Sequence, residues 1–358
     1  MGVSMSEVVP FVAMVFSEGV TMGISTISKA AMTQGLSTFV LVVYSDALAT
    51  LILFPFCYFK RNKELHLTFP VLCRFFLLGF IGVWGEILYP IGVKYSSPTL
   101  ASAMVNLSQI FTFLLAIIFR MEKLDLRSST FQAKSLGTIV LVSGAFIATL
   151  YKGPSLLALS PSNSPHTRDH HQLLFSRQLD WIIGGVLLAI TFLVSAIWNI
   201  AQTAIVKSYP DELTVIFFYN LFVAIQSMIA TLVVEKNPAA WKLKSGIQIT
   251  AVVCSAIFGS VIRLGIHTWC LHKKGPVYVV MFRPLEIVFA VFMTVIFLGE
   301  TLHLGSMIGS LTIAIGFYTV MWGQIKEKEM VMDDGIASLE SASHDKAPLL
   351  KSHSSDET

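Results

Sequence analysis

The feature that most constrains this sequence is a series of long apolar runs. Runs of about 20 residues, each long enough to cross a hydrocarbon core of roughly 30 Å as an α-helix, recur between residues 8 and 323. Of the 358 residues, 54% are hydrophobic and 13% are charged, which is more apolar surface than one water-soluble core hides. The sequence therefore predicts an all-α membrane protein with little chain left for a soluble domain.

We expect ten transmembrane helices, separated by charged or proline-containing turns. The segment 60–64 reads KRNKE and cannot lie in hydrocarbon, while Pro98 and Pro276 follow polar turns, where a helix begins. The count of ten depends on dividing the stretch 70–119 between Pro90 and Pro98. The expected helices span residues 8–30, 36–59, 70–93, 98–119, 135–151, 181–206, 213–235, 247–272, 277–299 and 303–323.

The distribution of lysine and arginine favours a cytoplasmic N-terminus. With that orientation the basic loops at 60–63, 120–134 and 273–274 lie inside, as the positive-inside rule requires. The three lysines of segment 236–244 then lie outside, so the second half supports the orientation only weakly. Both termini are expected in the cytoplasm.

Two polar segments flank the second half of the chain. Residues 152–180 form a connector, and residues 324–358 form a tail expected to be disordered. His166, His170 and His171 lie in the connector without a cysteine or carboxylate framework, which favours a linker over a metal site.

The chain repeats itself after 178 residues. The halves are residues 8–151 and 181–323, and each holds five expected helices, an odd number, so the second must enter the membrane inverted. Many secondary transporters share this plan, with the solute site near the midplane between the repeats. The aligned landmarks are Pro98 with Pro276 and Glu122 with Glu300, then, after a six-residue gap, Gly137 with Gly309 and Gly144 with Gly316.

Polar residues form stripes along four of the expected helices. Such groups face a bundle interior or a water-filled cavity, although each can also simply join two helices by hydrogen bonds. The large amides are the stronger candidates for lining a cavity because each needs several partners. The candidate residues are Asn106, Gln109, Asn199 and Gln202, together with the flanking Trp198 and with His267.

Charged residues at membrane depth are the more specific signal. They are Glu18, Asp46, Glu86, Arg263, Arg283 and Glu286. We hypothesise that the two arginines attract a solute carboxylate, while Glu18, Asp46 or Glu86 meets an ammonium group or carries a proton. The alternative for Arg283 and Glu286 is a local ion pair three residues apart on one helix. Pro284, beside Arg283, is expected to free a backbone carbonyl there.

Several strings resemble the nodulin-21-like UMAMIT family of plants, within the drug/metabolite transporter superfamily. They are NLSQIFTF at 106–113, FRMEKL at 119–124, YKGP at 151–154, KGPVY at 274–278, FLGE at 297–300 and MWG at 321–323. The resemblance covers nearly all of residues 8–323. It implies ten helices in two inverted EamA repeats and bidirectional, facilitative movement of amino acids or related compounds such as auxin.

This chain departs from the family pattern at two positions. The family has a neutral asparagine where Arg283 stands and a serine near Glu286. The departure favours an anionic or more specialised solute over a generic amino acid.

The tail carries an acidic dileucine-like string, Asp345 to Leu350, in which Asp345, Leu349 and Leu350 fit the pattern read by sorting adaptors. The plasma membrane is the first expectation for location and the vacuolar membrane the second.

Other classes of protein fit less well. No cofactor or metal is expected, and neither a nucleophile with a base nor a metal-ligating motif of an intramembrane enzyme is present. The cysteines, at positions 57, 73, 254 and 270, lie in apolar segments without ligand spacing. A solute channel remains the alternative to a carrier.

Overall fold

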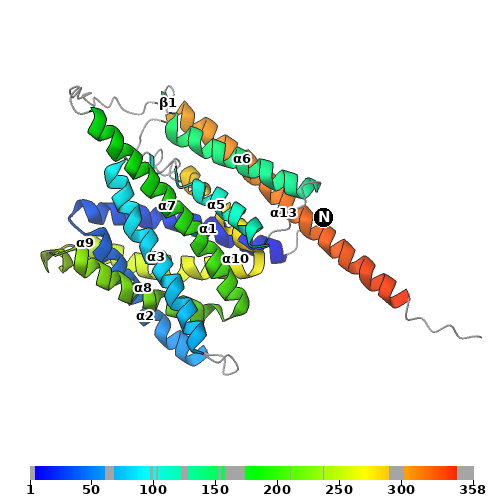
Figure 1. Cartoon of the computed structure of the whole chain (residues 1–358), viewed down its shortest axis with the longest axis horizontal. Coiled ribbons are helices and arrows are strands. Elements are labelled where there is room, and N and C mark those ends of the chain that lie inside the picture. Colours follow the sequence, from blue (N-terminus) through cyan, green and yellow to red (C-terminus); the bar gives the residue numbers. More distant parts are fainter. Residues whose placement is uncertain are drawn as a thin grey trace, which may run out of the picture.

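The computed structural model describes residues 5–60, 68–96, 100–101, 104–121, 128–151, 155–157, 174–209, 211–236, 238–289 and 302–344. Helices dominate these residues (Figure 1). The first half contains α1 (Met5–Thr33), α2 (Thr38–Lys60), α3 (Phe69–Tyr95), α5 (Leu107–Ile118) and α6 (Ser129–Leu150). The second half contains α7 (Leu174–Ser208), α8 (Glu212–Val234), α9 (Gly246–Cys254), the π-helix η2 (Ser255–Arg263), α10 (Leu264–Lys274), α11 (Pro276–Val280) and α13 (Leu304–His344). A 3-10 helix, η1 (Pro238–Trp241), follows α8.

Eight helical segments of the described chain are long and apolar enough to cross a membrane. They correspond to eight of the ten expected helices, and α9, η2 and α10 form one of them. The remaining two expected helices, 98–119 and 277–299, appear as shorter pieces, and residues 290–299 lie outside the described chain. The expected division between Pro90 and Pro98 is confirmed, because α3 ends at Tyr95 and the chain is helical again at residue 100.

Contacts between the two halves follow the relation that the internal repeat predicts. Helices α2 and α8, and helices α6 and α13, are counterparts in the two repeats, and the members of each pair touch one another. Helices α5 and α11, which belong to the counterpart expected helices 98–119 and 277–299, also touch. Helix α1 packs against the α9–η2–α10 segment, and its counterpart α7 packs in the same way against α3. This reciprocity is what a two-fold axis between inverted repeats produces.

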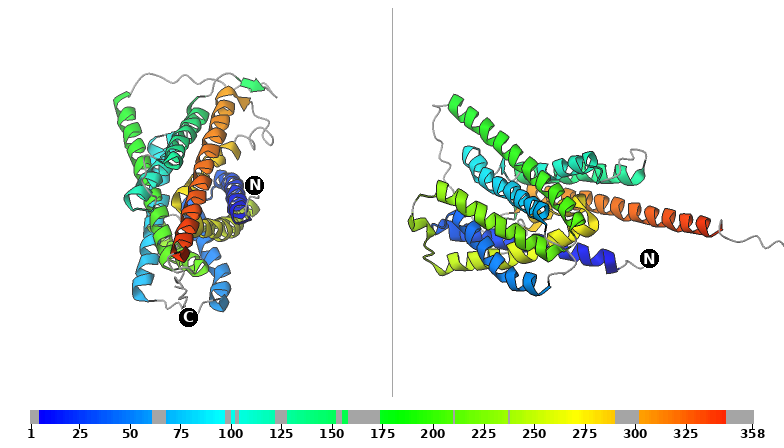
Figure 2. Two further views of the ribbon diagram at one scale, coloured as in Figure 1. Left: turned by 90° about the vertical axis from the view of Figure 1, so that its right-hand side faces the viewer. Right: turned by 60° about the horizontal axis from the view of Figure 1, so that its bottom comes forward.

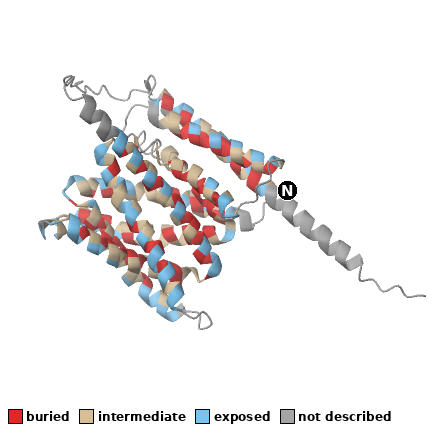
Figure 3. Ribbon diagram, viewed as in Figure 1, coloured by how far each residue is buried: buried red, intermediate tan, exposed pale blue. Residues whose placement is uncertain are grey.

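The outer face of the bundle is apolar and the polar groups turn inward. Leu51, Leu136 and Tyr318 are 70%, 60% and 71% exposed, as expected for side chains that meet lipid. Buried residues run along the inner faces of the helices (Figure 3).

Helix α6 lies side by side with the first part of α13 (Figures 1 and 2). Glycines allow this close approach. A Cβ added to Gly144 would lie 2.8 Å from the backbone nitrogen of Ile313, and one added to Gly316 would lie 2.7 Å from the Cα of Leu141. Gly137 and Gly309 also lie at this contact. The four glycines that align in the internal repeat therefore all lie where the two helices touch.

Two helices that are counterparts in the repeat are both interrupted. Before α5 the chain forms a turn at Val105 and Asn106, and after α11 it forms a turn at residues 281–284 before becoming helical again at 285–289. With the 178-residue offset, Asn106 aligns with Pro284. The amide of Leu285 bonds to Phe282 O instead of to Met281 O, and Pro284 has no amide proton to donate. The carbonyl of Met281 therefore lacks both of its usual helical donors. The bond that Pro284 itself removes is the one to Val280 O, four residues back, which instead accepts from the amide of Arg283 at 3.2 Å.

The structure differs from the sequence expectations at the polar segments. Ser155–Leu157 of the connector form strand β1, which pairs antiparallel with β2, Leu302–His303. Helix α13 continues to His344, although the sequence predicted a disordered tail from residue 324. The composition of these segments did not predict either element. A two- or three-residue strand leaves little signal in the sequence, and charged side chains do not prevent a helix from extending into water.

Candidate functional site: a polar centre between the repeats

The structure gathers charged residues from both repeats between the helices. Glu18 (α1) has Arg283, Glu286 and Arg263 as its charged neighbours. Both arginines also act electrostatically on Glu286, so they lie in one neighbourhood. We use the term charge cluster for Glu18, Asp46, Glu86, Arg263, Arg283 and Glu286, which come from α1, α2, α3, η2, the turn after α11 and the helical residues 285–289.

Asp46 of α2 is held by a direct hydrogen bond. The hydroxyl of Ser260 donates to Asp46 Oδ1 at 2.8 Å, and the side-chain amide of Asn220 on α8 donates to the carbonyl of Ser260 at 3.1 Å. Arg263, one turn further along η2, is the cation that acts on Asp46. Three elements thus fix one buried carboxylate.

Ser260 and Arg263 belong to a π-helix, a geometry frequent at functional sites. A regular α-helix would place Ser260, Arg263 and His267 on one face. The wider π turn changes the angular spacing between Ser260 and Arg263, while His267 lies in α10, where the α-helical spacing has resumed.

The two guanidinium groups are unpaired in the described part of the chain. Neither Arg263 nor Arg283 makes a side-chain hydrogen bond or ion pair with another described residue. The local ion pair between Arg283 and Glu286, the alternative that the sequence left open, does not form among these residues. Both arginine side chains are partly exposed. A cation that is unpaired at membrane depth is stable when it faces water or a ligand.

Amide side chains form a second group beside the charge cluster. Gln202 Nε2 donates to Thr268 Oγ1 at 2.8 Å, and Asn199 Nδ2 donates to the carbonyl of Ser195 at 3.0 Å. The Oε1 of Gln202, the Oδ1 of Asn199 and both polar atoms of the Gln109 amide are buried without a hydrogen-bond partner. Buried polar atoms are ordinarily satisfied, so these atoms mark places for water or a ligand.

His267 links the amides to the charges. It is buried, its Nδ1 has no hydrogen-bond partner, and Arg283 and Arg263 are its charged neighbours. Its ring lies 6.2 Å from that of Trp198, which lies 5.6 Å from that of Tyr219. Asn106 is buried at the break before α5. All twelve residues singled out from the sequence are therefore placed. Eleven of them are related to this centre by a contact, a charged neighbour or an unpartnered atom described above, while Asn106 is placed by its burial at the break.

Sequence reasoning overlooked several residues of this centre, namely Tyr219, Asn220, Thr268 and also Tyr89, which has Glu286 as its charged neighbour. Asn220 could have been found by the rule that selected Asn199, since it is a large amide within an apolar segment. The tyrosines carry no such signal because aromatic residues are common in apolar helices.

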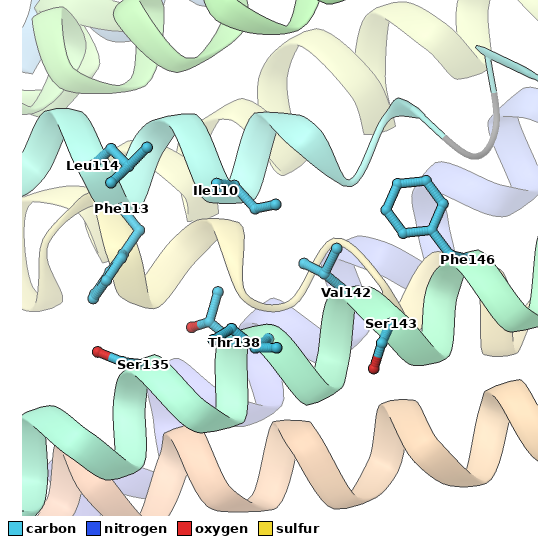
Figure 4. A pocket seen from close by; sticks show the side chains of 9 residues that line it. Ile110, Phe113, Leu114, Ser135, Thr138, Val142, Ser143 and Phe146 are labelled. Carbon is cyan, nitrogen blue, oxygen red and sulfur yellow. The ribbon is translucent and has the colours of Figure 1, made fainter.

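A separate apolar hollow lies between α5 and α6 (Figure 4). Its volume is about 390 Å³, and its wall includes Phe113, Leu114, Ile139 and Phe146. Leu114 and Ile139 are 50% and 66% exposed, so the hollow opens on the outer face of the bundle. It contains none of the charged residues and is not the polar centre.

The described residues contain no group of three or more histidine, cysteine or acidic side chains that could hold a metal ion. His166, His170 and His171 lie outside the described residues.

A duplicated helical bundle with a polar centre between its halves defines a multi-pass membrane transporter fold. The model of the EamA-like transporter family matches residues 10–150 and 182–322. The chain belongs to this family, and it is a transporter, not an enzyme.

Relatives and a solved structure agree with this assignment. The chain is 45% identical to WAT1-related protein At3g28050 of Arabidopsis thaliana, over 98% of this chain and 97% of that protein. It is 46% identical to WAT1-related protein At5g40240 of the same plant, over 97% and 93%. A structure described as "Crystal structure of protein" aligns with 87% of this chain and 96% of its own at a TM-score of 0.64 and 14% identity, which shows a shared fold. The expected resemblance to plant EamA-domain transporters is confirmed.

Proposed function

We propose that this transporter moves a small organic solute that carries a carboxylate, of the amino acid class or a related anion such as auxin. The observation that carries the proposal is the pair of unpaired guanidinium groups, Arg263 and Arg283, among partly exposed and buried polar side chains. A guanidinium binds a carboxylate through two parallel hydrogen bonds and selects for that shape. Glu18 and Glu286, beside Arg283, supply the negative charge that would meet an ammonium group.

The amide side chains complete the solute site in this proposal. The unpartnered atoms of Gln109, Asn199 and Gln202 offer both donors and acceptors to the polar part of a solute. Trp198 supplies an aromatic face next to His267. A site of this composition suits a small amphipathic solute, with polar groups that fix its orientation.

Alternating access is the proposed mechanism. Two interrupted helices, one from each repeat, place breaks at Asn106 and at Pro284, and broken helices near the midplane are where carriers build their sites. Rocking of one repeat against the other would expose the site first to one side and then to the other.

We place both termini in the cytoplasm and the protein in the plasma membrane, with the vacuolar membrane as the alternative. Asp345, Leu349 and Leu350, proposed to be read by a sorting adaptor, lie outside the described residues.

The test is uptake into proteoliposomes of a panel of labelled amino acids, auxin and other organic anions. Saturable uptake of one solute class by the wild type is expected. Arg283→Gln should weaken the apparent affinity roughly tenfold to a hundredfold, the loss of one charge-assisted contact. Arg74→Gln is the matched control because Arg74 is exposed in the first turns of α3. Equal affinity in wild type and Arg283→Gln would contradict the proposed anion site.

A further inference from the structure

The charge cluster contains more carboxyl groups than cations. Glu18 and Glu286 have Arg283 as their strongest charged neighbour. Asp46 and Glu86 have Arg263 as their cation. Each arginine is thus the main cation for two carboxyl groups, although Arg263 also acts on Glu18 and Glu286. Full ionisation of the four carboxyl groups would leave two uncompensated negative charges in the cluster. A net charge of this kind at membrane depth is costly.

The pair Asp46 and Glu86 differs from the pair Glu18 and Glu286. Glu18 and Glu286 are each affected most strongly by an arginine, whereas Glu86 is affected most strongly by another carboxyl group. The charged group that acts most strongly on Glu86 is Asp46, ahead of Arg263. Two carboxylates in one site do not both stay ionised, because each disfavours the charged form of the other. One shared proton removes the conflict and leaves Arg263 balanced by a single carboxylate.

A hydrogen bond distinguishes the two carboxyl groups. Asp46 accepts the hydroxyl hydrogen bond of Ser260, which favours its ionised form. The Oδ1 of Asn220, whose amide nitrogen donates to the Ser260 carbonyl, is buried without a partner, so this network has room for one more donor such as water. Glu86 makes no side-chain hydrogen bond to a described residue and is left as the group to be protonated.

Glu86 also borders a space large enough for water. It is exposed although it lies among α2, α3 and α8, and it forms part of the wall of a hollow of about 20 Å³ with Val42, Ser227 and Thr231. This volume holds about one water molecule. The titratable and charged groups facing Glu86 are Asp46 from α2, Tyr219 from α8 and Arg263 from η2. Tyr219 lies against α3 one turn before Glu86, since its hydroxyl would be 2.7 Å from a Cβ added to Gly82.

We propose that Glu86, opposed to Asp46 across Arg263, is a proton-binding site that couples transport to the pH gradient. On loading, a hydronium ion in the hollow gives its proton to a carboxyl oxygen of Glu86 and leaves a water molecule, and on release water takes the proton back. Loading neutralises the Asp46–Glu86–Arg263 group and release restores a net negative charge, which gives the two states different stabilities at membrane depth. The coupling to transport rests on the proposed carrier function, whereas the proton site itself does not.

The first experiment needs no solute. Infrared difference spectra of the purified full-length protein are recorded between about pH 5 and about pH 9, in H₂O and D₂O, to follow the carbonyl band of protonated carboxyl groups. A deuterium-sensitive band present in the wild type should be lost in Glu86→Gln and retained in Glu235→Gln, a control at the far end of α8. Asp46→Asn removes the neighbouring charge, so the Glu86 band should need stronger acid to appear. Spectra of correctly folded Glu86→Gln that match the wild type would overturn the proton site.

The second experiment tests the coupling. In proteoliposomes, an imposed pH gradient should accelerate uptake of the transported solute by the wild type and by Glu235→Gln. In Glu86→Gln, the part of uptake that responds to the gradient should disappear. A gradient response that persists in Glu86→Gln overturns the coupling. If no solute of the panel is carried, the transport proposal fails, and the infrared result still decides the proton site.

Discussion

At the scale of single residues, the centre depends on a few hydrogen bonds that reach across helices. Ser260 donates to Asp46 Oδ1 and accepts from Asn220 through its carbonyl, so it joins α2, η2 and α8. Most other serine and threonine hydroxyls of the bundle bond to carbonyls of their own helix, as Thr112 does with Ser108. Removing such a local bond should change the stability of the protein little. Removing the Ser260 hydroxyl would instead leave Asp46 without its hydrogen-bond donor.

Replacing Ser260 with alanine should therefore destabilise the protein. Loss of a hydrogen bond to a charged carboxylate is expected to lower the free energy of unfolding by about 1.5–3 kcal/mol. Thermal unfolding in detergent measures the change. Ser143→Ala is the control, because Ser143 is exposed and bonds only to Val140 of its own helix. Equal midpoints for the two variants would show that the Ser260 contact contributes nothing.

How far these residues could be predicted depends on their chemistry. Glu18, Asp46 and Arg283 were predictable because an ionisable group in an apolar segment is costly unless it faces the interior. Their division into two groups, each of two carboxyls with one arginine, was not predictable. It depends on which helices meet, and the spacing within one helix does not contain that information. Tyr219 was missed because aromatic residues are common in apolar helices.

At the scale of elements, the breaks in the two counterpart helices are the main departure from regular structure. The sequence predicted one of them, because Pro284 removes a donor, but Asn106 carries no helix-breaking signal of that kind. The break at Asn106 became visible only in the structure, where the amide of Gln109 bonds to Asn106 O three residues back.

Restoring the donor at the second break should impair transport. Pro284→Ala supplies an amide proton and permits a continuous helix, which would turn Arg283 away from Glu18. We expect transport to fall by about tenfold or more in the proteoliposome assay. Pro55→Ala is the matched control because α2 runs through Pro55 without interruption. Wild-type transport by Pro284→Ala would show that the break has no functional role.

The contact between α6 and α13 gives a second prediction at this scale. Gly144→Ala would place a Cβ 2.8 Å from the nitrogen of Ile313, and overpacking of this kind costs about 1–3 kcal/mol. Gly23 has no atom within 4 Å of an added Cβ, so Gly23→Ala should be neutral or stabilising by roughly 0.5–1 kcal/mol. The thermal unfolding midpoints of both variants and the wild type measure these changes in stability. A Gly144→Ala protein as stable as the wild type would contradict the close packing of α6 and α13.

At the scale of the whole molecule, the bundle has two distinct ends. Ser245 Oγ donates to Gln34 Oε1 at 2.6 Å, so the loops after α1 and before α9 lie at one end. His272 and Glu212 are in contact at 3.0 Å, which places the start of α8 and the end of α10 together. This arrangement agrees with the sides expected from the sequence, while the assignment of inside and outside stays a prediction.

Cysteine labelling tests that assignment. In a background without Cys57, Cys73, Cys254 and Cys270, a cysteine in place of Lys244 should react with a membrane-impermeant reagent on intact cells. One in place of Lys273 should react only after permeabilisation. The opposite result would invert the orientation, and labelling of both on intact cells would contradict their placement on different sides.

We propose above that one solute site between the repeats opens alternately to the two sides of the membrane. Ser195→Cys places a nearly isosteric thiol beside Ser108, whose hydroxyl is 3.4 Å from that of Ser195, and next to the carbonyl that binds Asn199. The measurement is its rate of modification by an impermeant thiol reagent from either side of oriented membranes, in the same cysteine-free background. We predict reaction from each side and slowing from both sides when the transported solute is present. Reaction from one side alone, or rates that the solute does not change, would contradict the account.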